Sequence, residues 1–193
     1  TRKIWLAGQV VYIVCATAIY TVAILLSTIL ICGQRCYVGN IWSETAVKLA
    51  FTSAGKKLSL AASEKTLELT RPYACMTTIF FLLFAYALVM VLLIFWFRIL
   101  WNELAGMIAG VVFNGISFIF SPGILQKLLG ISERKSYLAN VAAGWISPLS
   151  HATYHLHNFG YDRLPSLRDS GIYDMVLVIM LILLNLYLSL IHI

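Results

Sequence analysis

The residues best able to do chemistry lie in one polar segment, SHATYHLHNFGYDRLPSLRDS, at residues 150–170. Its histidines and acids, together with the acid that follows it, are His151, His155, His157, Asp162, Asp169 and Asp174. His151 and His155 have the i, i+4 spacing that places two imidazoles on one face of a helix, where they could bind a metal ion. A zinc protease of the HExxH type would need Glu at position 152, where Ala152 stands. We therefore expect interfacial or loop histidines that hold no metal.

Other catalytic signatures are absent from the sequence. No GxSxG motif occurs, and no Cys lies beside a His and an acid. The Gly55-Lys56 pair has Ala50 where a phosphate-binding loop needs glycine. Membrane di-iron oxidases use several histidine boxes, whereas this chain has 4 histidines in all. We expect no catalytic residue and no cofactor in the chain. A small membrane metalloenzyme that uses His151, His155 and Asp162 stays open as an alternative.

The elements that must position these residues are membrane helices. The chain has 193 residues, of which 61% are hydrophobic and 11% are charged, and its mean hydropathy is +0.87. Soluble domains carry about 25% charged residues, so this composition excludes a water-soluble globular protein. The expected fold class is all-α, a polytopic helical membrane protein that forms a single transmembrane domain.

Four apolar stretches are predicted to cross the membrane, at residues 4–32, 76–97, 104–120 and 175–193. A helical crossing needs roughly 20 residues, and the third stretch is the shortest of the four. A tight polar connection that contains Arg98, Asn102 and Glu103 separates the second stretch from the third, which predicts a helical hairpin.

Two segments, residues 33–73 and 121–174, are predicted to be polar or interfacial. In the first, apolar residues recur at helical spacing around residues 41–50, which is typical of a short helix lying along the membrane surface. In the second, residues 138–147 are apolar but too few to cross, and Pro148 interrupts them. This pattern predicts a re-entrant or interfacial segment.

Small residues mark one face of the third apolar stretch. Gly106 and Gly110 form a GxxxG motif, and Asn114 follows one turn later. Small side chains let another helix approach closely, and an amide can form a hydrogen bond across such a contact. We expect these three residues to pack against a neighbouring helix rather than to bind a ligand.

The charge distribution indicates lipid rather than nucleic acid as a partner. Lys and Arg number 14 against 8 Asp and Glu, a net charge of +6, and the bases are scattered over the loops, where they would meet lipid phosphates.

The positive charges do not settle the orientation of the chain in the membrane. A cytoplasmic start would leave Arg2, Lys3 and Arg98 inside with the remaining bases outside, and the positive-inside rule prefers the reverse. The orientation is therefore left open. Ionisable residues are nearly absent from the predicted crossings, which favours a passive conduit over a proton relay.

Three segments carry a resemblance to a known family. They are Thr1-Arg2-Lys3-Ile4-Trp5 with Gln9, Val10 and Tyr12, then IWSETAVKLAF, and above all WISPLSHATYHLHNFGYDRLPSL before the final apolar stretch. The pattern resembles permease subunits of bacterial ABC exporters of the ABC-2 type. The resemblance implies a multi-pass protein of the bacterial plasma membrane that works as a homo- or heterodimer with a separate ABC ATPase subunit. It also implies about six crossings, with an extracytoplasmic segment before the last one.

The function expected from this resemblance is that of a transport subunit, not of an enzyme. The permease would move a peptide, lipid or drug-like substrate, and residues 137–150 would gate the outer mouth of the path. Because the chain starts with Thr1 and shows four crossings, we expect a fragment that lacks N-terminal helices. The other alternative is a non-catalytic membrane partner or immunity protein.

Overall fold

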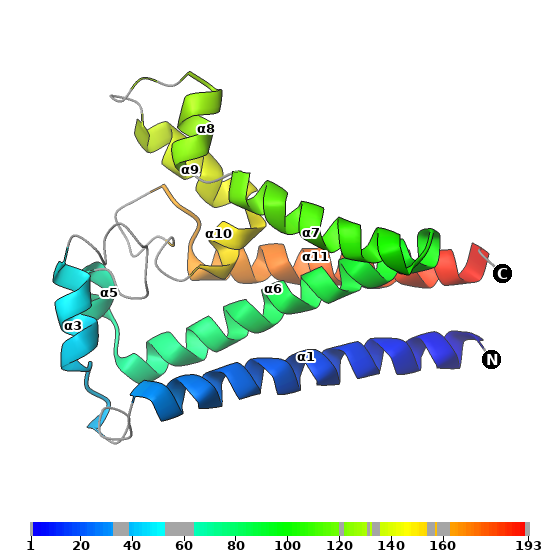
Figure 1. The fold of residues 1–193 in the computed structure, drawn as a ribbon, viewed down its shortest axis with the longest axis horizontal. Coiled ribbons are helices and arrows are strands. Elements are labelled where there is room, and N and C mark those ends of the chain that lie inside the picture. Colours follow the sequence, from blue (N-terminus) through cyan, green and yellow to red (C-terminus); the bar gives the residue numbers. More distant parts are fainter. Residues whose placement is uncertain are drawn as a thin grey trace.

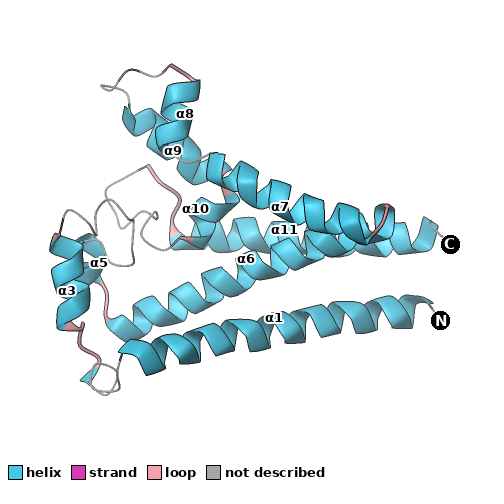
Figure 2. Ribbon diagram, viewed as in Figure 1, coloured by secondary structure: helices cyan, strands magenta, loops and turns pink. Residues whose placement is uncertain are grey.

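Long apolar stretches form long helices in this protein, because a backbone in lipid must satisfy its own hydrogen bonds. The computed structural model describes residues 2–32, 39–52, 64–119, 122–130, 132, 136–153, 157 and 163–191. Within these ranges the regular structure is helical and no strand occurs (Figure 1, Figure 2). The all-α fold class predicted from composition is therefore confirmed.

In the part of the chain that the structure describes, three helices are long and apolar enough to cross a membrane. They are α1 (Arg2–Cys32), α6 (Pro72–Leu100) and α11 (Leu167–Ile191). A fourth apolar helix, α7 (Glu103–Ile119), has 17 residues and is about 25 Å long at 1.5 Å per residue, close to the thickness of a bilayer core. The chain is a multi-pass membrane protein.

Within the described residues, five shorter helices lie in the connections between these long ones. The connection between α1 and α6 contains α3 (Glu44–Phe51) and α5 (Glu64–Leu69). The connection between α7 and α11 contains α8 (Pro122–Leu128), α9 (Ser136–Ile146) and α10 (Pro148–Ala152).

Helix α6 is the central element and contacts α1, α7 and α11. Seven buried residues from three helices form the main core, namely Leu6, Ile13, Leu88, Val89, Leu92, Phe95 and Leu181. Both ends of the chain and the α6–α7 turn lie at one end of the molecule, with α3 and α5 at the other (Figure 1). The long connections between helices therefore lie on one side of the bundle.

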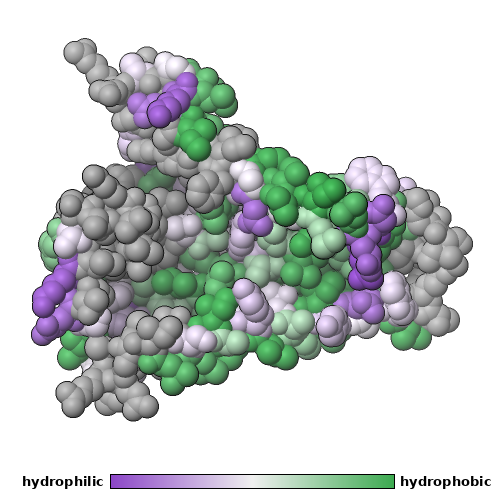
Figure 3. Space-filling view, viewed as in Figure 1, coloured by the Kyte–Doolittle hydropathy of each residue, from purple (hydrophilic) through white to green (hydrophobic). Residues whose placement is uncertain are grey.

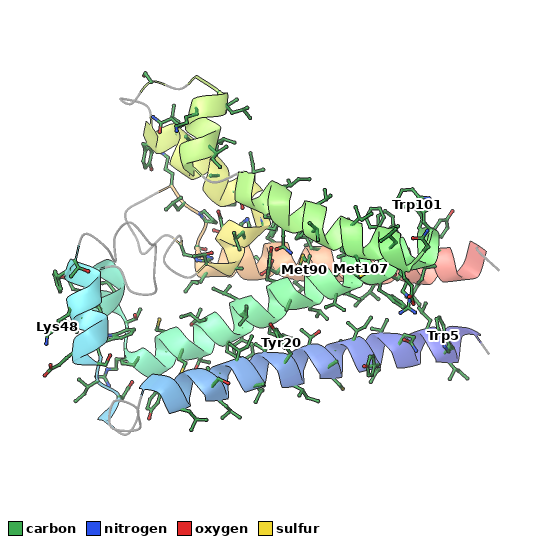
Figure 4. All side chains as sticks on the ribbon, in the orientation of Figure 1. Trp5, Tyr20, Lys48, Met90, Trp101 and Met107 are labelled. Atoms are coloured by element: carbon green, nitrogen blue, oxygen red, sulfur yellow. The ribbon has the colours of Figure 1, made fainter. Side chains whose placement is uncertain are left out.

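The surface matches a lipid environment. Figure 3 shows hydrophobic residues along much of this face, with hydrophilic residues gathered on α3 and near the α6–α7 turn. Trp5 and Trp101 are 58% and 67% exposed and lie at the same end of the molecule, opposite Lys48 (Figure 4). Exposed tryptophans at the end of an apolar span are typical of the membrane–water interface.

Local signals explain the hairpin formed by α6 and α7. Pro72 occupies the first helical position of α6 after an extended Arg71, a place where proline costs no hydrogen bond. Asn102 caps α7, because its Oδ1 accepts from the Ala105 amide at 2.8 Å. Across the turn, Arg98 forms an ion pair with Glu103.

The last helix begins at Leu167, before the predicted start at residue 175. Ser166 and Asp169 form a reciprocal cap: the Asp169 amide donates to Ser166 Oγ at 3.2 Å, and the Ser166 amide donates to Asp169 Oδ2 at 2.9 Å. This cap starts the helix among polar residues, so Asp169 and Asp174 lie inside the candidate span Leu167–Leu188. The expectation that the crossings nearly lack ionisable residues is wrong for this helix.

Candidate functional site

The short helices α9 and α10 form a broken helix that packs against the bundle. Ser147 has an extended backbone, φ −78° and ψ 120°, and Pro148 then begins α10. Helix α10 contacts α6, α7 and α11 as well as α9. The hydroxyl of the buried Ser147 donates to the carbonyl oxygen of Ser117 at 3.0 Å, which gives one of the last carbonyls of α7 a partner. The break is therefore anchored to the end of a membrane helix.

The residues just before α11 hold α9 in place. Trp145 Nε1 donates to the Arg163 carbonyl at 3.0 Å, and the Arg163 amide donates to the Tyr137 hydroxyl at 3.0 Å. A Cβ added at Gly144 would lie 2.8 Å from Leu164 Cδ2, closer than real side chains come. An alanine at this position would therefore force the end of the Leu164 side chain to shift, and Gly144 avoids that contact.

Beneath this broken helix, two histidines bracket one serine of α11. Ser170 Oγ lies 2.7 Å from His151 Nδ1 and 2.8 Å from His157 Nε2. The outer ring nitrogens contact carbonyl oxygens: His151 Nε2 lies 3.2 Å from the Trp145 oxygen, and His157 Nδ1 lies 3.0 Å from the Thr153 oxygen. The side chains of the two histidines and of the serine between them are each at most 2% exposed. We call His151, Ser170 and His157 the His–Ser–His chain.

Proton counting constrains the His–Ser–His chain. Carbonyl oxygens only accept hydrogen bonds, so the outer nitrogen of each imidazole must carry a proton. Two neutral imidazoles and one hydroxyl then supply three protons for four contacts. When both imidazoles of the His–Ser–His chain are neutral, one of the two contacts between a ring nitrogen and Ser170 Oγ therefore has no hydrogen atom. A fourth proton would turn that contact into a hydrogen bond.

Burial favours the neutral form of His151. Desolvation lowers the pKa of His151 below its ordinary value, while the hydrogen bond to the Trp145 carbonyl and the negative charge of Asp169 oppose this shift. The ring of Tyr173 stacks on His151, with ring centroids 4.0 Å apart. Burial therefore disfavours a fourth proton on the His151 ring.

This geometry suits a structural hydrogen-bond network better than a catalytic centre. Ser170 is fully buried, so its hydroxyl cannot reach a substrate as a nucleophile. A metal at either His151 or His157 would have to break a hydrogen bond to the protein. No group of three or more His, Cys, Asp or Glu residues that could hold a metal occurs among the described residues. The other two candidate ligands, His155 and Asp162, lie outside those residues.

The small-residue face of α7 packs against α6 of the same chain. A Cβ added at Gly106 would lie 2.7 Å from the Ile94 carbonyl oxygen, and one at Gly110 would lie 2.9 Å from Ile94 Cδ1. Asn114 accepts from the Tyr86 hydroxyl at 2.8 Å across the contact, and its amide donates to the Gly110 carbonyl at 3.2 Å. These glycines are therefore used within the hairpin.

Sequence reasoning missed three residues of this region. Ser170 and Tyr173 were assigned to a polar connection, although the Ser-x-x-Asp pattern at residues 166–169 is a local sign of a helix start. Asn185 is fully buried in α11, and its amide donates to the Leu92 carbonyl of α6 at 3.3 Å. A single amide in an apolar run is the only sequence signal for that contact.

Comparisons of the chain with models of known protein families, with curated proteins and with solved structures find no match.

Proposed function

We propose that this chain is the membrane-spanning permease subunit of an ABC exporter of the ABC-2 type in a bacterial plasma membrane. The observation that carries the proposal is the broken helix of α9 and α10, placed directly before the last membrane helix and anchored to α7 through Ser147. The WISPLSHATYHLHNFGYDRLPSL segment, on which the family resemblance depends most, includes the last two residues of α9, the break at Ser147 and all of α10.

In this proposal the energy comes from a partner chain. Two permease subunits, identical or different, line a path for a peptide, lipid or drug-like substrate, and a separate ABC ATPase closes and opens it. The ends of the chain and the α6–α7 turn face the cytoplasm, while α9 and α10 lie on the outer side. This orientation is the reverse of the one that the positive-inside rule prefers for the loops of this chain. The rule is a weak guide where the first helix of the protein determines the orientation.

The broken helix has the properties of an outer gate. Helix α9 ends before the extended Ser147 and α10 begins at Pro148, so we expect the two short segments to pivot as units about Ser147. The hydrogen bonds that hold it, from Ser147 to Ser117 and from Trp145 to Arg163, can be exchanged without unfolding a membrane helix. Movement of α7 relative to α11 would reach this element directly, because α10 contacts both helices.

The deciding experiment is co-purification of tagged full-length protein from its native membrane. The proposal expects an ATP-binding cassette protein at a near-equal molar ratio, and substrate-stimulated ATP hydrolysis by the complex. Recovery of an intact chain with no such protein would refute the permease assignment and leave a non-catalytic membrane partner as the better interpretation. If the same preparation contains clearly less than one zinc or iron ion per chain, the alternative of a membrane metalloenzyme is excluded.

A variant tests the gate separately. Ser147→Ala removes the hydroxyl that anchors the break to α7, so we expect coupling between ATP hydrolysis and transport to weaken. Ser27→Ala is the matched control, because Ser27 is exposed on α1 and its hydroxyl donates only within its own helix, to the Ala23 carbonyl. Equal coupling in both variants would show that the break is not the gate.

A further inference from the structure

A pocket of about 400 Å³ lies between α6 and α11. Its walls are mostly apolar and include Leu82, Phe84, Leu88, Leu167 and Val178. Phe81 and Met175 also line it and are 61% and 63% exposed, so the pocket opens at the lipid-facing surface of the bundle. A volume of this size suits a small organic ligand.

Two residues that line this pocket have polar side chains, Thr78 and Asp174. The Thr78 hydroxyl donates within its own helix, to the Ala74 carbonyl at 2.8 Å. Asp174 is 4% exposed, and its Oδ2 has no hydrogen-bond partner among the described residues. Among the described residues of the lining, Asp174 therefore presents the polar group that is not already engaged.

Titratable groups near this end of α11 have partners of their own, and the ring of Tyr173, next to Asp174 in the sequence, stacks on His151. Asp169, also on α11, is held by Ser166, and His151 of α10 contacts Ser170 and Trp145. No ion pair to Asp174 occurs among the described residues. An isolated carboxylate buried in a membrane protein is costly, and such residues usually mark a ligand, ion or proton pathway.

We propose that this pocket binds a primary alkylammonium ion, with its N–H groups on Asp174 and its apolar body between α6 and α11. The ammonium supplies both the opposite charge and the donors that Asp174 lacks. The hydrocarbon or aromatic body is matched by the apolar walls, and the open side at Phe81 and Met175 admits a ligand that has partitioned into lipid. A free amine and the ethanolamine headgroup of a phospholipid share this chemistry.

A metal ion fits the pocket less well. Calcium takes six to eight oxygen ligands, and magnesium needs an octahedral shell. The pocket offers a single carboxylate within apolar walls. An anionic ligand would be repelled by that carboxylate. Binding is a property of this chain alone, so the inference does not rest on the proposed ATPase partner.

The test uses the full chain in nanodiscs of phosphatidylcholine, with 4-fluorophenethylammonium as the probe and ¹⁹F NMR as the measurement. The wild type should bind the probe more tightly than it binds 4-fluorophenethyl alcohol, which has the same body and no charge. Asp174→Asn keeps the side-chain shape and should weaken binding of the amine about tenfold or more, with little effect on the alcohol. Glu68→Gln is the control, because it removes an exposed carboxylate of α5 that does not line the pocket.

A second variant protects the test against misfolding. Ala85→Leu leaves the carboxylate in place and fills part of the pocket, so it should weaken binding of both the amine and the alcohol. Unchanged affinity for the amine in Asp174→Asn, or equal affinity of the wild type for the amine and the alcohol, overturns the inference. Competition by added phosphatidylethanolamine supports it and identifies the lipid headgroup as the source of the ammonium, whereas no competition with intact amine binding identifies a free amine.

Discussion

The contact between α6 and α7 predicts how replacing each of three glycines of α7 by alanine, which adds one methyl group, changes the stability of the fold. A Cβ at Gly106 would lie 2.7 Å from a backbone oxygen of Ile94, and one at Gly110 would lie 2.9 Å from a side-chain carbon of Ile94. A Cβ at Gly115 would meet nothing within 4 Å. Because all three changes are Gly→Ala in α7, they share the same change in intrinsic helix propensity. Differences among them therefore report the contact with α6.

The expected magnitudes follow from what each methyl group meets. Alanine gains roughly 1 kcal/mol over glycine in a helix interior, and Gly115→Ala should keep that gain. Overpacking a tight contact costs about 1–3 kcal/mol. At Gly106 the obstacle is backbone, so the two helices must separate and the full cost applies. At Gly110 the Ile94 side chain can rotate, so the loss should be smaller. The expected order of stability is Gly115→Ala, then Gly110→Ala, then Gly106→Ala.

The assay is reversible unfolding in mixed micelles, followed by far-UV circular dichroism as the fraction of SDS rises. Gly106→Ala should be less stable than Gly115→Ala by about 1–3 kcal/mol. Equal free energies of unfolding for these two variants would refute the packing argument. The same reasoning applies to a larger side chain at Gly110, since the glycine face of α7 is occupied by α6 within the chain. We expect Gly110→Leu to weaken the hairpin first.

Three smaller perturbations test other contacts. Tyr86→Phe removes the donor to Asn114 and should cost about 0.6–2 kcal/mol in the same assay, with Tyr187→Phe, on an exposed tyrosine, as the neutral control. Asn102→Ala removes the cap of α7 and should cost about 0.5–2 kcal/mol, whereas an unchanged value would show that the Arg98 ion pair alone fixes the turn. Burial lowers the pKa of His151, so the unfolded chain takes up a proton that the folded chain resists. Stability should fall as the pH drops below about 6.5, and His151→Gln should flatten this slope between pH 5 and pH 8.

Much of the fold could be predicted because its signals are local. Long apolar runs predict membrane helices from composition alone, and the polar residues around Asn102 predict the hairpin turn. Helix α6 extends over Pro72–Leu100, beyond the predicted 76–97, since Pro72 can occupy the first helical position and Arg98 can reach the interface from the last turn. The start of α11 was missed because its first turns are polar, and a hydropathy pattern interprets polar residues as a loop.

The His–Ser–His chain could not be predicted, because it depends on the packing of α10 against α11. The i, i+4 spacing drew attention to His151 and His155 as a pair on one helix face. In the structure α10 ends at Ala152, so no continuous helix carries that spacing. His151 instead reaches His157 through Ser170, a residue 19 positions further along the chain from His151. Such a contact is a product of tertiary structure and leaves no periodic signal.

The last helix also changes how a passive conduit must be understood. Its buried polar residues, Ser170, Asp174 and Asn185, recur at offsets of 4 and 15 residues, which place them on one face of a helix of 3.6 residues per turn. Leu181, a core residue, lies on the same face, whereas Val176 and Leu183 are exposed on others. A membrane helix that only filled space would need no polar line, since each such group must find a partner inside the bundle. Ser170 is engaged in the His–Ser–His chain, and the Asn185 amide nitrogen donates to α6. Asp174 Oδ2 and Asn185 Oδ1 have no hydrogen-bond partner among the described residues, and of these two residues Asp174 lines the pocket between α6 and α11. The polar line therefore locates the position on α11 where an external ligand would gain most.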